Sequence, residues 1–358
     1  MNEFEKMVVE DSLLEKSIVY VDDDKGSVGT LTRDWVLSED VLQIEYIVKG
    51  LIKTDEEIFT VRFSVIKSAW TVHAKGVGPS ILRMLNSELF NLGPAGDIYC
   101  ANPYVELFIR NATKLRLVDV QDTLWGVDKT ELEQRVRDFN YFAISIQQEA
   151  RATPFRDTTK EFQRLANKNC AGLIKYFDRH FELRSKLVFL RIDLGISKSS
   201  NDSVSYEEIK RYKNSLMAYL KKKYSKEIFL GFAWKLEYGI EKGYHYHLLL
   251  IFNGRHVRED IVIAKLIGDH WNDVITSGKG VYHNCNANKF DYKYLAIGTI
   301  NQFDVELRSN LNNVATYLTK TDYHIKIVAP NNDQVFRKGN MPTLPTHRFG
   351  RPRREIIS

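Results

Sequence analysis

The stretch LEYGIEKGYHYHLLLIFN, residues 236–253, decides the fold of the second half of the chain. Two largely apolar runs flank the turn signal IEKG, a pattern typical of a β-hairpin. Because side chains alternate between the two faces of a strand, His245 and His247 lie on the same face. The opposite face carries residues that we predict to pack against helices: Tyr246, Leu248, Leu250 and Phe252.

Glu237 belongs to the first strand of this hairpin and is expected to lie opposite the two histidines. Two imidazoles and one carboxylate can bind a divalent cation while leaving positions open for a substrate oxygen. Two hydrogen-bonded histidines with a purely structural role would give the same pattern. The hairpin by itself therefore leaves both interpretations open.

Patterns on both sides of the hairpin predict a small α+β domain. KLVFLRIDLG (186–195) is typical of a strand, and residues 205–224 and 258–275 have the apolar spacing of amphipathic helices. Residues 290–300 are expected to form an edge strand and residues 303–322 a final helix. The order β-α-β-β-α-β-α predicts an antiparallel sheet with helices packed on it.

The region before this domain has a mixed α/β pattern. Residues 44–52 and 59–66 flank the polar turn KTDEE and indicate a hairpin. Residues 79–92 and 131–150 are expected to be helices. We divide the chain into an N-terminal region of unknown role (1–157), a connecting helix (158–185), the α+β domain (186–328) and a basic C-terminal tail (329–358).

The final predicted helix carries a tyrosine beside a lysine. In NNVATYLTKTD (312–322), Tyr317 and Lys320 are three positions apart and share a face. A phenol is protonated at neutral pH, but it can attack a phosphodiester whose phosphate a metal polarises. A neighbouring ammonium can offset the charge that develops. A surface Tyr–Lys pair on an amphipathic helix is the alternative.

The order of the strand VFLRIDL, the hairpin and the helical segment ATYLTKTD resembles the three-motif layout of the HUH endonucleases. These enzymes nick DNA in rolling-circle replication, plasmid mobilisation and some transposition. Residues 186–325 look most like the inovirus-type replication proteins, whose prophage-borne relatives form the YagK/YfjJ C-terminal domain family. The resemblance implies that His245, His247 and Glu237 bind Mg²⁺ or Mn²⁺, that Tyr317 forms a 5′-phosphotyrosine, and that Lys320 assists it.

The first strand of the domain departs from this resemblance. Arg191 and Asp193 stand where many relatives have a threonine-rich motif. Asp193 is therefore an alternative to Glu237 as the third metal ligand. Tyr317 is the one well-placed tyrosine, so the paired-tyrosine layout of some phage initiators is absent, and the sequence does not indicate how one phenol completes a replication cycle.

Composition and charge are consistent with a DNA-binding protein of the bacterial cytoplasm. Apolar residues make up 44% of the chain, the net charge is +5, and the three cysteines are dispersed. No run approaches the ~20 apolar residues of a membrane span, and the acidic N-terminus does not resemble a signal peptide. Two basic clusters are expected to contact DNA phosphates: Lys221, Lys222 and Lys223 in one, and Arg351, Arg353 and Arg354 in the other.

Together these features predict a replication initiator of a phage, prophage or plasmid. It would nick and join single-stranded or hairpin origin DNA, with a host helicase and polymerase as further partners. A transposase or relaxase with the same chemistry, or a non-catalytic DNA-binding regulator that keeps the fold, are the alternatives. The sequence does not indicate the oligomeric state.

Overall fold

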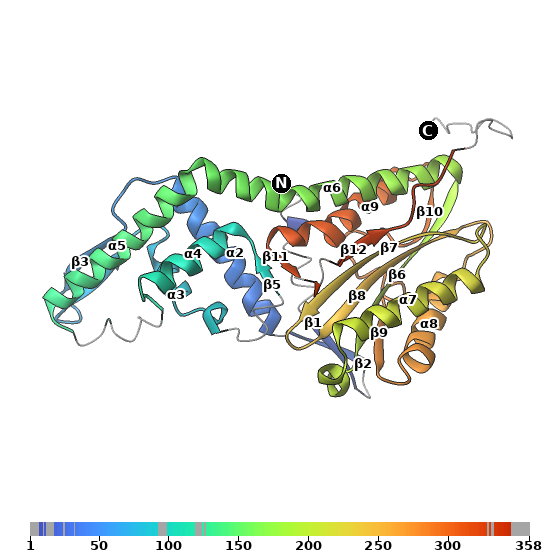
Figure 1. Cartoon of the computed structure of the whole chain (residues 1–358), viewed down its shortest axis with the longest axis horizontal. Coiled ribbons are helices and arrows are strands. Elements are labelled where there is room, and N and C mark those ends of the chain that lie inside the picture. Colours follow the sequence, from blue (N-terminus) through green and yellow to red (C-terminus); the bar gives the residue numbers. More distant parts are fainter. Residues whose placement is uncertain are drawn as a thin grey trace. The chain divides into compact units, whose positions relative to one another are not determined.

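The computed structural model describes residues 7–9, 11, 18–23, 26–31, 33–91, 99–118, 124, 127–327, 329–330 and 333–344. The chain divides into two compact units (Figure 1). The sheet unit comprises residues 1–31, 166–321 and 329–358, and the helical unit comprises residues 32–165 and 322–328. The four regions drawn from the sequence stay a prediction.

A six-stranded antiparallel sheet forms the centre of the sheet unit, with the order β10-β6-β8-β7-β12 and β9 also paired to β6. The predicted hairpin forms its middle. The strands are β6 (Lys186–Ile196), β7 (Phe229–Gly239), β8 (Gly243–Asn253), β9 (Gly280–Asn284), β10 (Gly298–Asn301) and β12 (Phe336–Lys338). The α+β fold class predicted from the sequence is confirmed.

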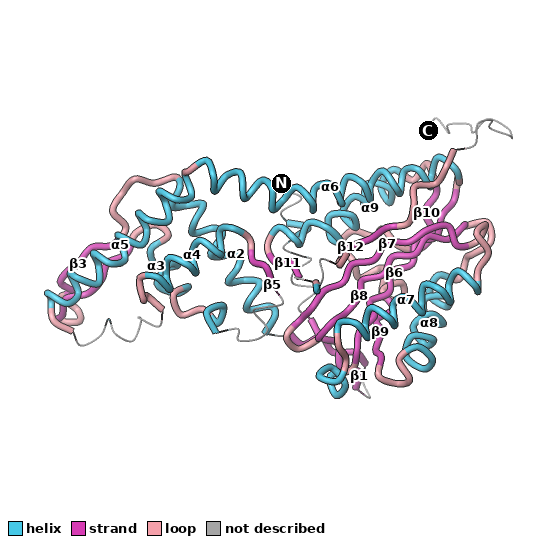
Figure 2. Tube along the Cα trace, in the orientation of Figure 1, coloured by secondary structure: helices cyan, strands magenta, loops and turns pink. Residues whose placement is uncertain are grey.

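Helices cover both faces of this sheet, as Figures 1 and 2 show. One face packs on α6 (Thr153–Leu183) and α9 (Val305–Thr319), where Leu249 and Ile251 of β8 join an apolar cluster with residues of both helices. The other face packs on α7 (Tyr206–Lys223) and α8 (Asp260–His270). The alternation predicted for β8 therefore holds, and the two histidines lie on the face of α6 and α9.

Local sequence explains where the helices of the sheet unit begin. Ser205 caps α7 in a capping box with Glu208, and Asp304 caps α9 by accepting a hydrogen bond from the backbone N–H of Leu307. Residues 1–31 of the same unit contribute a short hairpin, β1 (Ile18–Asp23) and β2 (Gly26–Leu31).

The helical unit packs α2 (Arg33–Ile52), α3 (Gly78–Met84), α4 (Pro103–Lys114) and α5 (Lys129–Arg151) around one apolar cluster. It also holds the hairpin β3 (Phe59–Ser64) and β4 (Ala69–Ala74). β11 (Ile325–Ile327) comes from the far end of the chain and pairs with β5 (Tyr99–Ala101). The first 13 residues of α6 also belong to this unit, since its boundary falls after Leu165.

Three local predictions need correction. Residues 44–52 do not form a strand but the end of α2, because the buried residues Val41, Ile44, Val48 and Leu51 follow helical spacing. The expected edge strand at 290–300 shortens to β10. β9 and β12 were not predicted, and β12 lies in the segment that the sequence presented as a basic tail.

Among the residues that the structure describes, no helix is both long and apolar enough to cross a lipid bilayer.

Candidate active site

The hairpin β7–β8 places Glu237, His245 and His247 in one cluster. Glu237 pairs in register with His245, and the ligand atoms of the three side chains all lie within 4.8 Å of one another. Glu237 Oε2 is 3.1 Å from His247 Nε2 and 3.8 Å from His245 Nε2. The geometry predicted from the hairpin pattern, a carboxylate opposite two imidazoles, is therefore present.

Gly243 makes the tight start of β8 feasible. Its φ is +62°, and a Cβ at this position would lie 2.5 Å from Asn201 Oδ1. Only glycine combines this backbone conformation with such a close approach. Asn201 in turn donates a hydrogen bond to the carbonyl of Glu241, which fixes the turn next to the cluster.

The His245 ring is prepared for a cation. Its Nδ1 lies 3.1 Å from the Gly243 carbonyl oxygen, and this contact favours the tautomer with the proton on Nδ1. Nε2 is buried and has no hydrogen-bond partner among the described residues, although Glu237 and His247 lie beside it. Burial lowers the pKa of His245 to about 4, so the ring is neutral at pH 7. A buried lone pair directed at a carboxylate and a second imidazole fits a divalent metal ion.

His247 is held between two carboxylates. Its Nδ1 is 2.8 Å from Asp193 Oδ1, and its Nε2 faces Glu237. Burial would lower the pKa of His247, but Asp193 and Glu237 outweigh burial and raise it. With Nδ1–H donated to Asp193, Nε2 is the nitrogen that faces Glu237 and His245, an orientation common among metal-binding histidines.

Asp193 lies on the Nδ1 side of His247, whereas Glu237 lies on the Nε2 side. Burial would raise the pKa of Asp193, yet the neighbouring charges of Arg191 and His247 hold it well below its usual range. The cluster that could hold a metal contains Glu237 and not Asp193. This geometry favours Asp193 as the residue that orients His247.

Helix α9 brings Tyr317 to the same cluster. Its hydroxyl oxygen lies 3.5 Å from His247 Nδ1, and the two rings meet edge to face with centroids 5.5 Å apart. Leu311, Ala315 and Leu318 anchor α9 in the apolar cluster on this face of the sheet. Tyr317 is only 7% exposed, so its hydroxyl lies in a largely desolvated position.

The half of the chain that carries these residues matches a known protein family. Residues 152–334, just over half of the chain, match the model of the YagK/YfjJ C-terminal domain. The chain belongs to this family. Neither a curated protein nor a solved structure matches it. The matched YagK/YfjJ region contains Glu237, both histidines and Tyr317, and it ends before β12.

Arg191 contacts the phenol of Tyr317 in the YagK/YfjJ domain. Its Nη2 donates a hydrogen bond to Tyr317 Oη at 2.6 Å and lies 3.1 Å from Asp193 Oδ2. The guanidinium carbon sits 4.2 Å from the centre of the Tyr317 ring. Sequence reasoning noted Arg191 but gave it no role. A signal for such a role was present in the sequence. Arg191 and Asp193 are two positions apart on a strand that pairs with the histidine strand, so both side chains lie on the histidine face.

Two buried lysines belong to or directly follow the strand and helix that carry these residues: Lys320, which was predicted to assist Tyr317, and Lys235. Lys320 follows α9 directly and is 6% exposed, and its assisting role stays a prediction. Lys235, which sequence reasoning missed, pairs in register with His247 and is 1% exposed. This buried lysine shares the face of Glu237, two residues along the same strand.

Of the two predicted phosphate-binding clusters, the structure places only the first, and it lies away from the candidate site. Lys221, Lys222 and Lys223 are exposed at the end of α7, on the other face of the sheet. The adjacent Tyr224 contacts Phe252, which lies about 16 Å along β8 from His247 at 3.3 Å per residue. Arg351, Arg353 and Arg354 lie outside the described residues.

Proposed function

We propose that this protein is an HUH-type endonuclease that initiates rolling-circle replication of a phage, prophage or plasmid. The observation that carries the proposal is the position of the Tyr317 hydroxyl, 3.5 Å from Nδ1 of His247, which belongs to the Glu237–His245–His247 cluster. A buried phenol next to such a cluster has an evident use in phosphodiester cleavage. Membership of the YagK/YfjJ family supports the proposal through the resemblance of that family to inovirus replication proteins.

Glu237, His245 and His247 would hold Mg²⁺ or Mn²⁺, which would polarise the scissile phosphate of single-stranded or hairpin origin DNA. Asp193 would keep the His247 ring in the orientation that directs Nε2 to the ion. Hard oxygen ligands favour these ions and imidazoles favour Zn²⁺, but phosphoryl transfer fits Mg²⁺ and Mn²⁺ well.

Tyr317 would be the nucleophile. Its oxygen forms a bond to phosphorus while the bond from phosphorus to the 3′-oxygen breaks. The phenolic proton passes to solvent, and the departing 3′-oxygen takes up a proton to become a hydroxyl that a host polymerase can extend. Arg191 can only donate hydrogen bonds, so its contact with the Tyr317 oxygen stabilises the phenolate as it forms.

A nicking assay tests this function. We expect the full-length protein, with Mn²⁺ and supercoiled DNA carrying its own origin region, to produce nicked circles and a protein–DNA adduct that survives SDS. Omission of Mn²⁺ should leave the DNA intact. Tyr317→Phe should abolish both products, because it removes the attacking oxygen and keeps the ring.

Tyr292→Phe is the matched control, since the Tyr292 ring lies 5.6 Å from the same Arg191 guanidinium. This variant should still nick and form the adduct. Adduct formation by Tyr317→Phe would disprove the assignment of the nucleophile. DNA binding by the wild-type protein with neither nick nor adduct would instead favour a non-catalytic regulator.

A further inference from the structure

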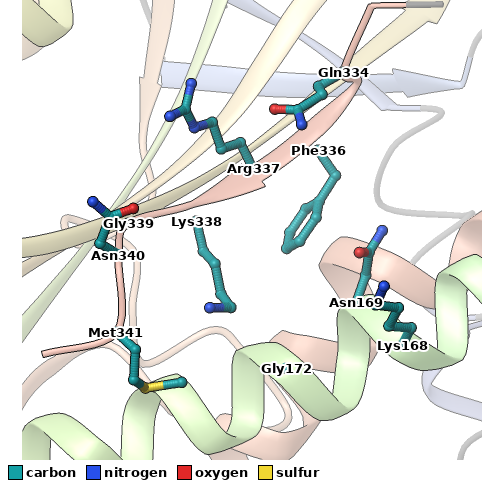
Figure 3. A pocket seen from close by; sticks show the side chains of 10 residues that line it. All are labelled: Lys168, Asn169, Gly172, Gln334, Phe336, Arg337, Lys338, Gly339, Asn340 and Met341. Atoms are coloured by element: carbon teal, nitrogen blue, oxygen red, sulfur yellow. The ribbon is translucent and has the colours of Figure 1, made fainter.

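A pocket of about 640 Å³ opens between α6 and β12 in the sheet unit. Figure 3 shows Phe336 and Lys338 directed from β12 toward α6, and Arg337 directed away, as strand alternation requires. The ten lining residues include three cations and no acid: Lys168, Asn169, Gly172, Gln334, Phe336, Arg337, Lys338, Gly339, Asn340 and Met341. A pocket of this composition favours an anionic ligand.

Among the residues that the structure describes, neither Lys168 nor Lys338 has an ion-pair partner, whereas Lys210 in the same unit pairs with Asp333. Lys338 is half-buried, with its Nζ 4.9 Å from the centre of the Tyr176 ring, and burial lowers its pKa. An anion in the pocket would offset the cost of keeping this ammonium charged there.

β12 is fixed in the sheet, so the pocket has a defined wall. The backbone N–H of Gly339 donates to the Phe232 carbonyl. A Cβ on Gly339 would lie 2.3 Å from Tyr176 Oη, so glycine allows the strand to approach α6 this closely. The Phe336 ring packs on the apolar cluster of α6 and α9 and also lines the pocket.

The pocket lies on the same face of the sheet as the active site. Phe336 pairs in register with Lys235, and Lys235 pairs with His247. Two strand spacings of about 4.8 Å therefore separate Phe336 from His247, or about 10 Å. This distance corresponds to about three nucleotides at the 3.4 Å rise of a stacked strand. Gln334 extends the lining toward Leu236, whose N–H donates to the Val335 carbonyl.

We propose that this pocket binds the sugar-phosphate backbone of the single DNA strand that flanks the phosphodiester cleaved by Tyr317. Lys168 and Lys338 contact its phosphates, and Phe336 offers its ring to a base. The inference rests on the proposed nicking function for the identity of the strand. Its phosphate contacts come from β12, beyond the segment that matches the YagK/YfjJ family, and from α6.

Binding of single-stranded DNA tests the proposal separately from cleavage. The full-length Tyr317→Phe protein is titrated with a fluorescent oligothymidylate of about 16 nucleotides at several salt concentrations. Adding Lys168→Ala and Lys338→Ala together should lower the affinity about tenfold. The slope of log affinity against log salt should fall by about 1.4, at about 0.7 for each lost phosphate contact in a single strand.

Lys226→Ala is the control, because Lys226 is exposed in the same unit and does not line the pocket. This substitution removes one positive charge, as each of the two pocket substitutions does. Its affinity and salt slope should stay within twofold of those of the parent. Thermal unfolding of each variant excludes misfolding, and Lys168→Glu, at an exposed helical position, should weaken binding further.

Two results would overturn the proposal: equal affinities for the double variant and Lys226→Ala, or equally strong binding of the mononucleotide dTMP, which would indicate a nucleotide pocket. The two proposals can be told apart. If the wild-type protein does not nick origin DNA but the pocket variants lose oligothymidylate binding, the nicking function is disproved and the single-strand binding site is supported.

Discussion

At the scale of single residues, the contact between Arg191 and Tyr317 has the clearest chemical consequence. One guanidinium reaches the phenolic oxygen and the Asp193 carboxylate together, and it covers the aromatic ring. A planar fork of donors can make these contacts at the same time, whereas the single ammonium of a lysine cannot do so in the same geometry. If Tyr317 is the nucleophile, as proposed above, Arg191 is positioned both to hold its ring and to stabilise its charge.

Arg191→Lys should therefore slow cleavage of origin DNA about 100-fold, the loss typical of removing one donor that stabilises developing charge. DNA affinity should remain unchanged, because Arg191 is only 9% exposed. Single-turnover adduct formation and equilibrium binding measure the two quantities. Lys320→Gln serves as the comparison: a larger loss of rate there than for Arg191→Lys would return the assisting role to Lys320.

At the scale of elements, β6, the strand that carries Arg191, has two short partners on the side away from β8. β10 pairs with residues 186–189 of β6 and β9 with residues 192–196, which leaves a gap between them. The buried Asn286 side chain fills it by donating to the Phe189 carbonyl and accepting from the Arg191 N–H, at 3.0 and 2.8 Å. Asp260 accepts the second N–H of this amide.

Asn286→Ala should lower the free energy of unfolding by about 3 kcal/mol, since two buried backbone groups lose their hydrogen-bond partners. Urea denaturation measures this change. Asn288→Ala, in the exposed turn two residues later, should shift stability by no more than about 0.5 kcal/mol. Similar values for the two variants would show that the gap on β6 is satisfied without Asn286.

Most regular elements could be predicted because long periodic segments such as residues 205–224 and the hairpin carry their own pattern. The strand predicted at 44–52 was wrong because its apolar residues were considered without the preceding turns of α2, which give them helical spacing. β9 and β12, of five and three residues, form only through their partners on β6 and β7. The Arg191–Tyr317 contact spans 126 positions, so no local spacing encodes it.

At the scale of the whole molecule, the segment that follows α9 belongs to the other unit. Residues 322–328 are part of the helical unit, where β11 pairs with β5 and the backbone N–H of Asn102 donates to the His324 carbonyl. The chain thus leaves the sheet unit four residues after Tyr317 and returns to it at residue 329. The segment directly after α9 is therefore held in place only while the helical unit is folded.

Glu45 holds this returning segment in place. Its carboxylate accepts hydrogen bonds from His324 Nδ1 at 2.9 Å, from Asn102 Nδ2 at 2.8 Å, and from Lys49. Burial would raise the pKa of Glu45, but the contacts with His324 and Lys49 outweigh burial and lower it to about 2. Because the unfolded chain takes up the proton near pH 4.5, the ionised carboxylate stabilises the fold above that pH, and this contribution is lost as the pH falls toward 2.

Glu45→Gln should consequently lower the free energy of unfolding by about 3 kcal/mol at pH 7, the equivalent of the shift in pKa. The difference between wild type and variant should shrink as the pH falls from 4.5 toward 2, because protonation makes the wild-type side chain equally neutral. Urea denaturation across this range measures it, with Glu106→Gln, an exposed acid of α4, as the control. A difference that stays constant with pH would mean that Glu45 stabilises the unit through packing and not through its charge.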